Sequence, residues 1–289
     1  MKVLILGGTG SIGTAVTREL VRSGHQVTGL SRSAASDSRL GAMGARPLRG
    51  DLRRPEGWVQ EVASTDALIQ LAATFGDGMA AADTTAITAI LHQAARRPEP
   101  LRLLYTGGCW LYGATGDRIA NEASPLRPIK PFAWMQENGQ RVLASPALSA
   151  AVVHPAMVYH AGGGVFSRYL EAARSARPFE IWGSITTRWP LVHRSDLARA
   201  YRLLLEQPQL TGHFNASAET GVPVADITAE IARRHAHDAS YVVRSLKYVL
   251  TKHGAWAEGP ALDQQMESGK LRRLAGWQVK HSNFRTAHF

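Results

Sequence analysis

Only one cysteine, Cys109, occurs in the 289 residues, and the chain has no long hydrophobic run. A single cysteine excludes an internal disulfide and is typical of a reducing compartment. Because a transmembrane helix needs roughly 20 apolar residues in succession, we expect no membrane span. A short apolar stretch and a glycine-rich turn occupy the place of a secretory signal, so we expect none. These absences predict a cytoplasmic protein that does not associate with membranes.

Acidic residues are in the minority, since 33 lysines and arginines stand against 23 aspartates and glutamates, a net charge of +10. The basic residues are scattered in short clusters, and no nucleic-acid-binding motif accompanies them. We therefore expect no nucleic-acid partner. The excess charge is explained by a solvated surface and by a pocket for an anionic cofactor or substrate. The length and a hydrophobic content of 45% fit one large α/β domain, alone or with a smaller lobe.

The first thirteen residues carry the strongest pattern. The apolar run Lys2–Leu6 predicts a buried strand, and glycines at positions 7, 10 and 13 open an amphipathic helix. Such glycines allow a tight turn, close approach of a pyrophosphate and close packing of the helix on the strand. The helix N-terminus then faces the phosphates. A glycine-rich turn without a ligand is the alternative. The predicted contacts to a dinucleotide are Gly7, Thr9, Gly10, Ser11, Ile12 and Gly13.

No acidic residue follows the second predicted strand, Gln26–Leu30. Dinucleotide-binding folds place there an acid for the ribose 2′-hydroxyl or an arginine for a 2′-phosphate. Ser31 and Arg32 occupy the position, so we expect NADP(H) rather than NAD, with NADPH preferred. A solvated surface arginine and NAD binding are the alternatives.

Strands and helices alternate along the chain. Strands are predicted at residues 46–48, 66–73 and 101–106, with a long helix at 83–97. This alternation predicts a doubly wound parallel sheet whose strand ends form one binding crevice. In the last third, strands are predicted at 178–183, 188–192 and 212–215 and a helix at 196–205.

In several stretches the sequence resembles the short-chain dehydrogenase/reductase superfamily, in its extended or atypical branch. That branch contains NAD(P)-dependent sugar epimerases, dehydratases and related reductases. The matching stretches are residues 7–13, 50–52, 68–73, 105–113, 154–159, 192–198 and 268–277. Each is modest alone, but their order and spacing are specific and span nearly the whole chain.

The resemblance implies a division of labour along the chain. Residues 1–158, with 184–220 returning to them, would form the Rossmann domain, and 159–183 with 221–289 the substrate lobe. Asp196 would start a helix that fixes the lobe to the sheet, a structural role. The implied cofactor contacts are Asp51 and Leu52 at adenine, Leu71, Ala72 and Ala73 along the middle, and Pro155 and Val158 at the nicotinamide.

The Tyr-x-x-x-Lys catalytic motif of the superfamily is missing. Phe132 stands in place of the tyrosine and Gln136 in place of the lysine, and a spacing of four puts both on one helix face. Phenylalanine cannot donate the proton that accompanies hydride transfer, so another group must. We expect Tyr112 as the donor, with Thr106 orienting the substrate oxygen and Gln136 holding the ribose. Tyr159 and His154 are the alternative candidates for the proton donor.

Aromatic residues are predicted to crowd around the crevice, although core packing explains any one of them. They favour a flat, apolar or aromatic carbonyl or hydroxyl substrate. Arg188 matches an arginine that the superfamily uses on a substrate diphosphate, which keeps a nucleotide sugar as the rival. The eleven histidines show no metal-ligand spacing, so we expect no metal. The predicted substrate contacts are Phe75, Trp110, Phe132, Trp134, Met157, Tyr159, Arg188 and Trp189.

The sequence thus predicts an NAD(P)-dependent oxidoreductase or epimerase/dehydratase-like enzyme with a relocated proton donor. Two alternatives stay open. One is a non-catalytic NADP(H)-binding sensor or scaffold, and the other is a non-redox isomerase or cyclase on the same fold. The expected partner is a small-molecule substrate, and a homodimer is one expectation for the oligomeric state.

Overall fold

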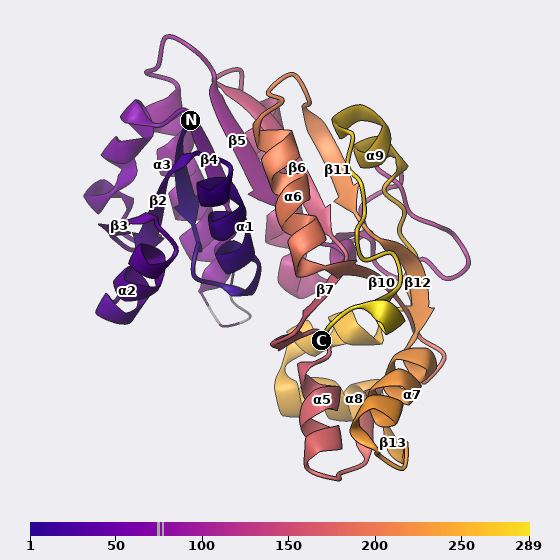
Figure 1. Cartoon of the computed structure of the whole chain (residues 1–289). Helices are drawn as coiled ribbons and strands as arrows, with labels where there is room; N and C mark the ends of the chain where they lie inside the picture. The colour runs from indigo at the N-terminus through magenta and orange to yellow at the C-terminus, as the bar shows by residue number, and fades with distance from the viewer. Residues whose placement is uncertain (74–75, 77) are drawn as a thin grey trace.

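A seven-stranded sheet with helices on both faces carries a smaller lobe at one end (Figure 1). The computed structural model describes residues 1–73, 76 and 78–289. The two helices in front of the sheet in Figure 1 are α1 (Ser11–Arg22) and α6 (Arg194–Leu205). Helices α3 (Met79–Ala94) and α4 (Ala133–Ala144) pack together on the opposite face.

All neighbours in the central sheet run parallel, and their order is β11-β6-β5-β4-β1-β2-β3. The order reverses between β1 and β4, where an open α/β sheet forms its ligand crevice. The predicted doubly wound sheet is therefore confirmed. The strands are β1 (Lys2–Leu6), β2 (Gln26–Ser31), β3 (Arg46–Arg49), β4 (Ala67–Gln70), β5 (Leu101–Thr106), β6 (Leu148–Pro155) and β11 (Gly212–Ala216).

Alternate residues of the central strands β1, β4, β5 and β6 enter two different cores. In β1, Val3 and Ile5 pack with α1 and with α2 (Ala34–Ala42) in one cluster, while Leu4 and Leu6 join α3 and α4 in the other. Side chains of a strand alternate between the faces, so a strand covered on both sides reads as a continuous apolar run. This explains why Lys2–Leu6 is recognisable in the sequence.

The glycine turn after β1 leaves no room for side chains. Gly7 has φ +85°, and a Cβ there would lie 2.6 Å from the backbone nitrogen of Ala72. A Cβ on Gly13 would lie 2.0 Å from the carbonyl oxygen of Gly7. These two approaches agree with the tight turn and the close helix packing predicted for the motif.

The lobe is built around a second sheet of order β12-β10-β7-β8 and a two-stranded sheet β13-β9. Helix α6 and strand β11 return to the central sheet, whereas β10 belongs to the lobe sheet. The lobe strands are β7 (Met157–His160), β8 (Gly163–Gly164), β9 (Phe179–Trp182), β10 (Arg188–His193), β12 (Glu219–Pro223) and β13 (Tyr241–Arg244). The remaining helices are α5 (Ser167–Arg174), α7 (Val224–His235), α8 (Leu246–His253) and α9 (Gly269–Ala275).

Element positions differ from the sequence-based ones mainly at their ends. Helix α3 begins at Met79, four residues before the predicted start, and ends at Ala94 before the two prolines. Strand β6 was not identified in the sequence analysis, although its residues 148–153 are mostly apolar. Within the described part of the chain, no helix combines the length and apolar character needed to cross a membrane.

We expect Gly13→Ala to lower the free energy of unfolding by about 1–3 kcal/mol, because the new methyl group meets the Gly7 carbonyl. Thermal unfolding measures the loss. Gly41→Ala is the matched control, since nothing lies within 4 Å of a Cβ at that helical position. It should be neutral or stabilising by up to about 1 kcal/mol. Equal melting temperatures for the two variants would contradict the expected clash.

Candidate functional site

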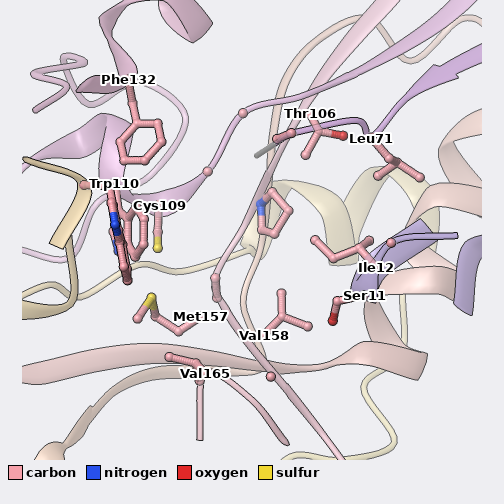
Figure 2. Close-up of a pocket in the computed structure, with 18 of the residues that line it drawn as sticks. Ser11, Ile12, Leu71, Thr106, Cys109, Trp110, Phe132, Met157, Val158 and Val165 are labelled. Atoms are coloured by element: carbon pink, nitrogen blue, oxygen red, sulfur yellow. The ribbon is translucent and has the colours of Figure 1, made fainter. Parts of the chain in front are cut away.

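A cavity of about 920 Å³ lies beyond the carboxyl ends of β1, β4, β5 and β6. Figure 2 shows Ser11, Ile12 and Leu71 on one side of it and Trp110, Phe132 and Met157 on the other. Its volume falls within the usual range for a pocket that takes a small organic ligand. The cavity therefore has one half against the glycine turn and one half against aromatic side chains.

The glycine-turn half has the features of a dinucleotide cradle. Of the predicted cofactor contacts, the residues lining it are Gly10, Ser11, Ile12, Gly13, Leu71, Ala72, Ala73, Thr106, Pro155 and Val158. Helix α1 starts at this wall, and among the described residues no side chain caps it and no acid lies in its first turn. Arg194 donates from Nη1 to the carbonyl of Ser11 at 3.4 Å. Open N–H groups, the helix dipole and this cation together suit a pyrophosphate.

The predicted adenosine contacts lie outside the cavity wall. Ser31 is buried and its hydroxyl donates to the carbonyl of Ser33 at 3.1 Å, and Arg32 is exposed between β2 and α2. Asp51 accepts from the backbone N–H of Arg53 at 2.9 Å. Leu52 packs at the edge of the core, while Gly7 and the half-buried Thr9 form the turn itself. Their contacts with a cofactor stay predictions.

The other half of the cavity is unusually rich in tryptophan. Ring centroids of Trp110 and Phe132 lie 5.3 Å apart. Nε1 of Trp189 donates to the carbonyl of Pro260 at 2.9 Å, and Nε1 of Trp134 to that of Pro131 at 2.9 Å. With their polar atoms satisfied, these rings present apolar surface to a ligand. Five of the seven tryptophans line the cavity, namely Trp110, Trp134, Trp182, Trp189 and Trp256.

Several lining residues were missed by the sequence analysis. Met135 on α4 lines the wall, whereas Gln136 is half-buried and does not. The Cys109 thiol also lines it, and burial raises its pKa to about 12, so the thiol is neutral. No local motif marks the others, which come from lobe elements distant in sequence. They are His160, Arg168, Trp182, His253 and Trp256.

Thr106, at the end of β5, brings a hydroxyl to the cavity. Its Oγ1 lies 2.7 Å from the hydroxyl oxygen of Tyr201 on α6. Tyr201 is fully buried, and that burial raises its pKa. A neutral phenol behind Thr106 holds the threonine hydroxyl in a defined direction.

A buried carboxylate, Asp83, closes the cavity beside β5. It accepts hydrogen bonds from the Tyr105 hydroxyl at 2.7 Å and from Nδ2 of Asn138 at 2.8 Å, and Nε2 of Gln70 is a third donor. Burial raises the pKa of Asp83, while the three donors oppose that shift. The network connects α3, α4, β4 and β5 and so fixes the floor of the cavity.

Tyr112 does not reach the cavity, contrary to the expectation that it borders the nicotinamide end. Its buried hydroxyl donates to Oδ1 of Asn215 on β11 at 2.7 Å. His154 is also committed elsewhere, with Nε2 2.9 Å from Nδ1 of His213. Burial, helped by His213, lowers the pKa of His154 to about 3, so it is neutral and cannot act as an acid. Neither residue lines the cavity.

Two predicted substrate contacts are also wrong in position. Tyr159 is fully buried among Phe166, His193 and Phe289, away from the cavity wall. Arg188 donates from Nη2 to Asp263 at 2.6 Å and from Nη1 to Asp117 at 2.9 Å, so its guanidinium is neutralised within the protein. Phe75 lies outside the described residues. Trp110, Phe132, Trp134, Met157 and Trp189 do line the cavity.

His193, Asp196 and His281 bring ligand atoms within 4.8 Å of one another in the described part of the chain. The carboxylate of Asp196 is already engaged. It accepts from the backbone N–H groups of residues 280 and 281 at 2.9 Å each, and Arg199 forms an ion pair with it. The arrangement ties α6 to the C-terminal segment, which fits the structural role expected for Asp196. No metal site is proposed there.

The parallel sheet, the uncapped helix N-terminus and the adjoining cavity define a dinucleotide-binding α/β protein. The sequence profile of the NAD dependent epimerase/dehydratase family matches residues 3–217. The chain belongs to this family, as the resemblance implied.

A protein of unknown activity from Saccharomyces cerevisiae is 30% identical over 240 residues, which are 80% of this chain and 79% of that protein. The solved structure of a human epimerase family protein, SDR39U1, with NADPH has a TM-score of 0.79 at 20% identity and covers 100% of this chain and 98% of its own. The UDP-glucose 4-epimerase of Thermus thermophilus with NAD has a TM-score of 0.78 at 20% identity, covering 97% and 94%. At such identities the two structures show a shared fold.

The family is NAD(P)-dependent, and its two neighbours hold NADPH and NAD respectively. The expected cofactor class, NAD(P), is therefore confirmed for the family. The residues of the glycine-turn half fit a dinucleotide of this class.

The neutral, buried His154 makes a pH-dependent contribution to stability. Its native pKa of about 3 lies below that of an unfolded histidine, about 6.5, so unfolding takes up a proton between these values. Stability from this residue is therefore full above pH 6.5 and is lost as pH falls. We expect the stability difference between wild type and His154→Gln to shrink by about 2 kcal/mol from pH 6.5 to 5.

Urea unfolding across this pH range measures that difference. Glu219, whose pKa burial raises to about 7, acts in the opposite sense in both proteins and cancels in the comparison. The exposed His92 on α3 supplies the control variant, His92→Gln. A difference between wild type and His154→Gln that is independent of pH would show that His154 is not kept neutral.

Proposed function

We propose that this chain is an NADPH-dependent reductase of apolar or aromatic carbonyl compounds. The observation that carries the proposal is a single cavity that joins the uncapped start of α1 to a wall of tryptophans. The first half suits a dinucleotide phosphate, and the second suits a flat apolar substrate. A substrate in the tryptophan half lies next to whatever occupies the glycine-turn half.

Cofactor binding falls to the residues of the glycine-turn half. Backbone N–H groups at residues 11–13 would hold the pyrophosphate, and the small side chains of Ala72 and Ala73 leave room along the strand end. Pro155 and Val158 give the nicotinamide an apolar contact. When bound, the cofactor supplies a hydride for the substrate carbonyl carbon.

Thr106 takes over the contact to the substrate oxygen. Its hydroxyl lines the cavity and is oriented by Tyr201 at 2.7 Å. Phe132, at the position of the missing tyrosine, gives the substrate an apolar contact. Among the described lining residues, Asp83 and Tyr105 are occupied with each other, and Cys109 holds its proton firmly. We therefore assign the proton that completes the alcohol to water rather than to one of these three residues.

A nucleotide sugar is a poorer candidate for the substrate. The expected diphosphate ligand, Arg188, is paired with Asp263 and Asp117 and does not line the cavity. The tryptophans instead offer a broad apolar surface. The residue expected to bind the diphosphate of a nucleotide sugar is consequently not available to such a substrate.

A non-catalytic NADPH-binding protein is the second candidate. The loss of both the tyrosine and the lysine, at Phe132 and Gln136, favours it. NADPH oxidation with a panel of aromatic aldehydes and ketones distinguishes the two. Turnover supports the reductase, whereas tight NADPH binding without turnover supports the sensor or scaffold. Conversion of a compound without NADPH consumption would indicate a non-redox isomerase or cyclase.

NADPH should bind about tenfold to a hundredfold more tightly than NADH, because a charge-assisted contact from Arg32 to the 2′-phosphate contributes about 1.5–3 kcal/mol. Arg32→Ala should remove most of this preference. Arg39→Ala, an exposed arginine on the neighbouring α2, is the control and should keep it. Calorimetric titration of all three proteins with both cofactors is the measurement. Equal affinities in the wild type contradict the assignment.

Thr106→Val should lower kcat for an aromatic aldehyde about 10²–10³-fold, the usual cost of losing one donor to a developing oxyanion. Thr106→Ser keeps the hydroxyl and should retain most of the rate. NADPH affinity, measured in parallel, should change little in either variant. Full activity in Thr106→Val would remove this residue from the reaction.

A further inference from the structure

We propose that the substrate carries a carboxylate, and that Arg168 in the lobe binds it. This inference rests on the proposed function, because it names the class of compound that enters the tryptophan half of the cavity. Arg168 lies in the first turn of α5 and is one of the lining residues. The substrate would be a flat, apolar carbonyl compound with one negative charge.

Aromatic neighbours hold the guanidinium of Arg168 in place. Its Cζ lies 3.8 Å from the ring centroid of Trp182 and 4.9 Å from that of Tyr169. Nη2 also donates to the Tyr169 hydroxyl at 3.2 Å. A planar guanidinium stacked on an indole keeps its edge available, and that edge fits a carboxylate with two parallel hydrogen bonds.

The charge of Arg168 has no counterpart in the described part of the protein. No ion pair there includes it, and its Nε is buried without a hydrogen-bond partner. Glu180, which accepts from Nε1 of Trp182, pairs instead with Arg244 at 3.4 Å and Lys252 at 3.9 Å. A half-buried guanidinium at a cavity wall without a carboxylate partner keeps its charge available, which points to an anionic ligand.

Other arginines with a buried, unpaired Nε are different. Arg97 donates from Nη1 to the carbonyls of Val62 and Ala63, and Arg102 donates from Nη2 to that of Leu210 at 3.0 Å. Their terminal nitrogens thus support the fold and do not line the cavity. Among the described residues, Arg168 has only the Tyr169 hydroxyl as a hydrogen-bond acceptor, and it lines the space in which a substrate would lie.

The surroundings favour a single charge over a diphosphate. Trp182, which lies against the Arg168 guanidinium, also contacts two other lining residues. Its ring centroid is 4.7 Å from that of His253 and 5.8 Å from that of Trp256. Arg168 is the one arginine or lysine among the described lining residues. One guanidinium matches one carboxylate, and the indoles match an aromatic skeleton.

Calorimetry with two probes tests this assignment, in protein saturated with NADPH, which can transfer a hydride to neither of them. 2-Naphthoate and 2-naphthylmethanol share the skeleton and differ in the charge. Wild type should bind naphthoate at least tenfold more tightly than the alcohol. Arg168→Gln should lose that preference while binding the alcohol as before. The control Arg174→Gln, an exposed arginine on the same helix, should keep the preference.

Arg168→Lys provides a second variant in case Arg168→Gln does not fold. It keeps the charge but loses the planar fork, and should bind naphthoate at least threefold more weakly than wild type. Equal binding of both probes, binding of neither, or an unchanged preference in the folded Arg168 variants overturns the proposal. So does binding of uridine diphosphate in preference to naphthoate.

These measurements need no turnover, so they separate the two proposals. Arg168-dependent binding of naphthoate without any NADPH oxidation would leave the carboxylate site intact and reject the reductase. Carbonyl reduction at a rate that depends neither on the charge of the substrate nor on the residue at position 168 would support the reductase and reject the carboxylate site.

Discussion

The close approach of the Gly7 carbonyl to Gly13 is the constraint on which the arrangement of the cavity depends. With 2.0 Å from that oxygen to an imagined Cβ, helix α1 can start where it does only because residue 13 has no side chain. The same turn lies against the backbone of Ala72 at the end of β4. Helix start, turn and strand end therefore form one rigid corner, and the N-terminus of α1 is held facing the cavity.

Buried polar groups make the opposite wall similarly firm. Asp83 joins four elements through Tyr105, Asn138 and Gln70. His154 supports the loop at Gly107 and Gly108, because its Nδ1 accepts a hydrogen bond from the backbone N–H of Gly108 at 3.4 Å. A Cβ on Gly107 would lie 2.6 Å from Nδ1 of His154. The sequence offers His154 as a reserve proton donor, yet in the fold it binds Gly108 and His213. Buried polar networks whose hydrogen bonds are all made fix the local geometry, and here they fix the cavity wall around Thr106.

Much of the fold could be predicted from the sequence, because strands buried on both faces and glycines in a tight turn leave local signals. Side-chain direction does not leave such a signal. Tyr112 lies in a matching stretch and Arg188 matches a superfamily arginine, but Asn215 and Asp263, which bind them, come from distant parts of the chain. Arg168, Trp182 and Trp256 come from lobe elements and reach the cavity through the tertiary fold of the lobe. Lining residues in stretches with local or family signals were therefore predictable, and these three were not.

Ser11 of the glycine turn also touches the lobe, since its Oγ lies 3.0 Å from Nε2 of His160 on β7. Arg194, at the start of α6, contacts the backbone of the same serine. The seam between the two halves thus runs through the phosphate end of the cradle rather than around it. A ligand that displaced β7 would move the turn as well, and two ligands bound on either side of this seam would then be thermodynamically linked. Such linkage acts equally in both directions, and each ligand alters the affinity for the other by the same factor.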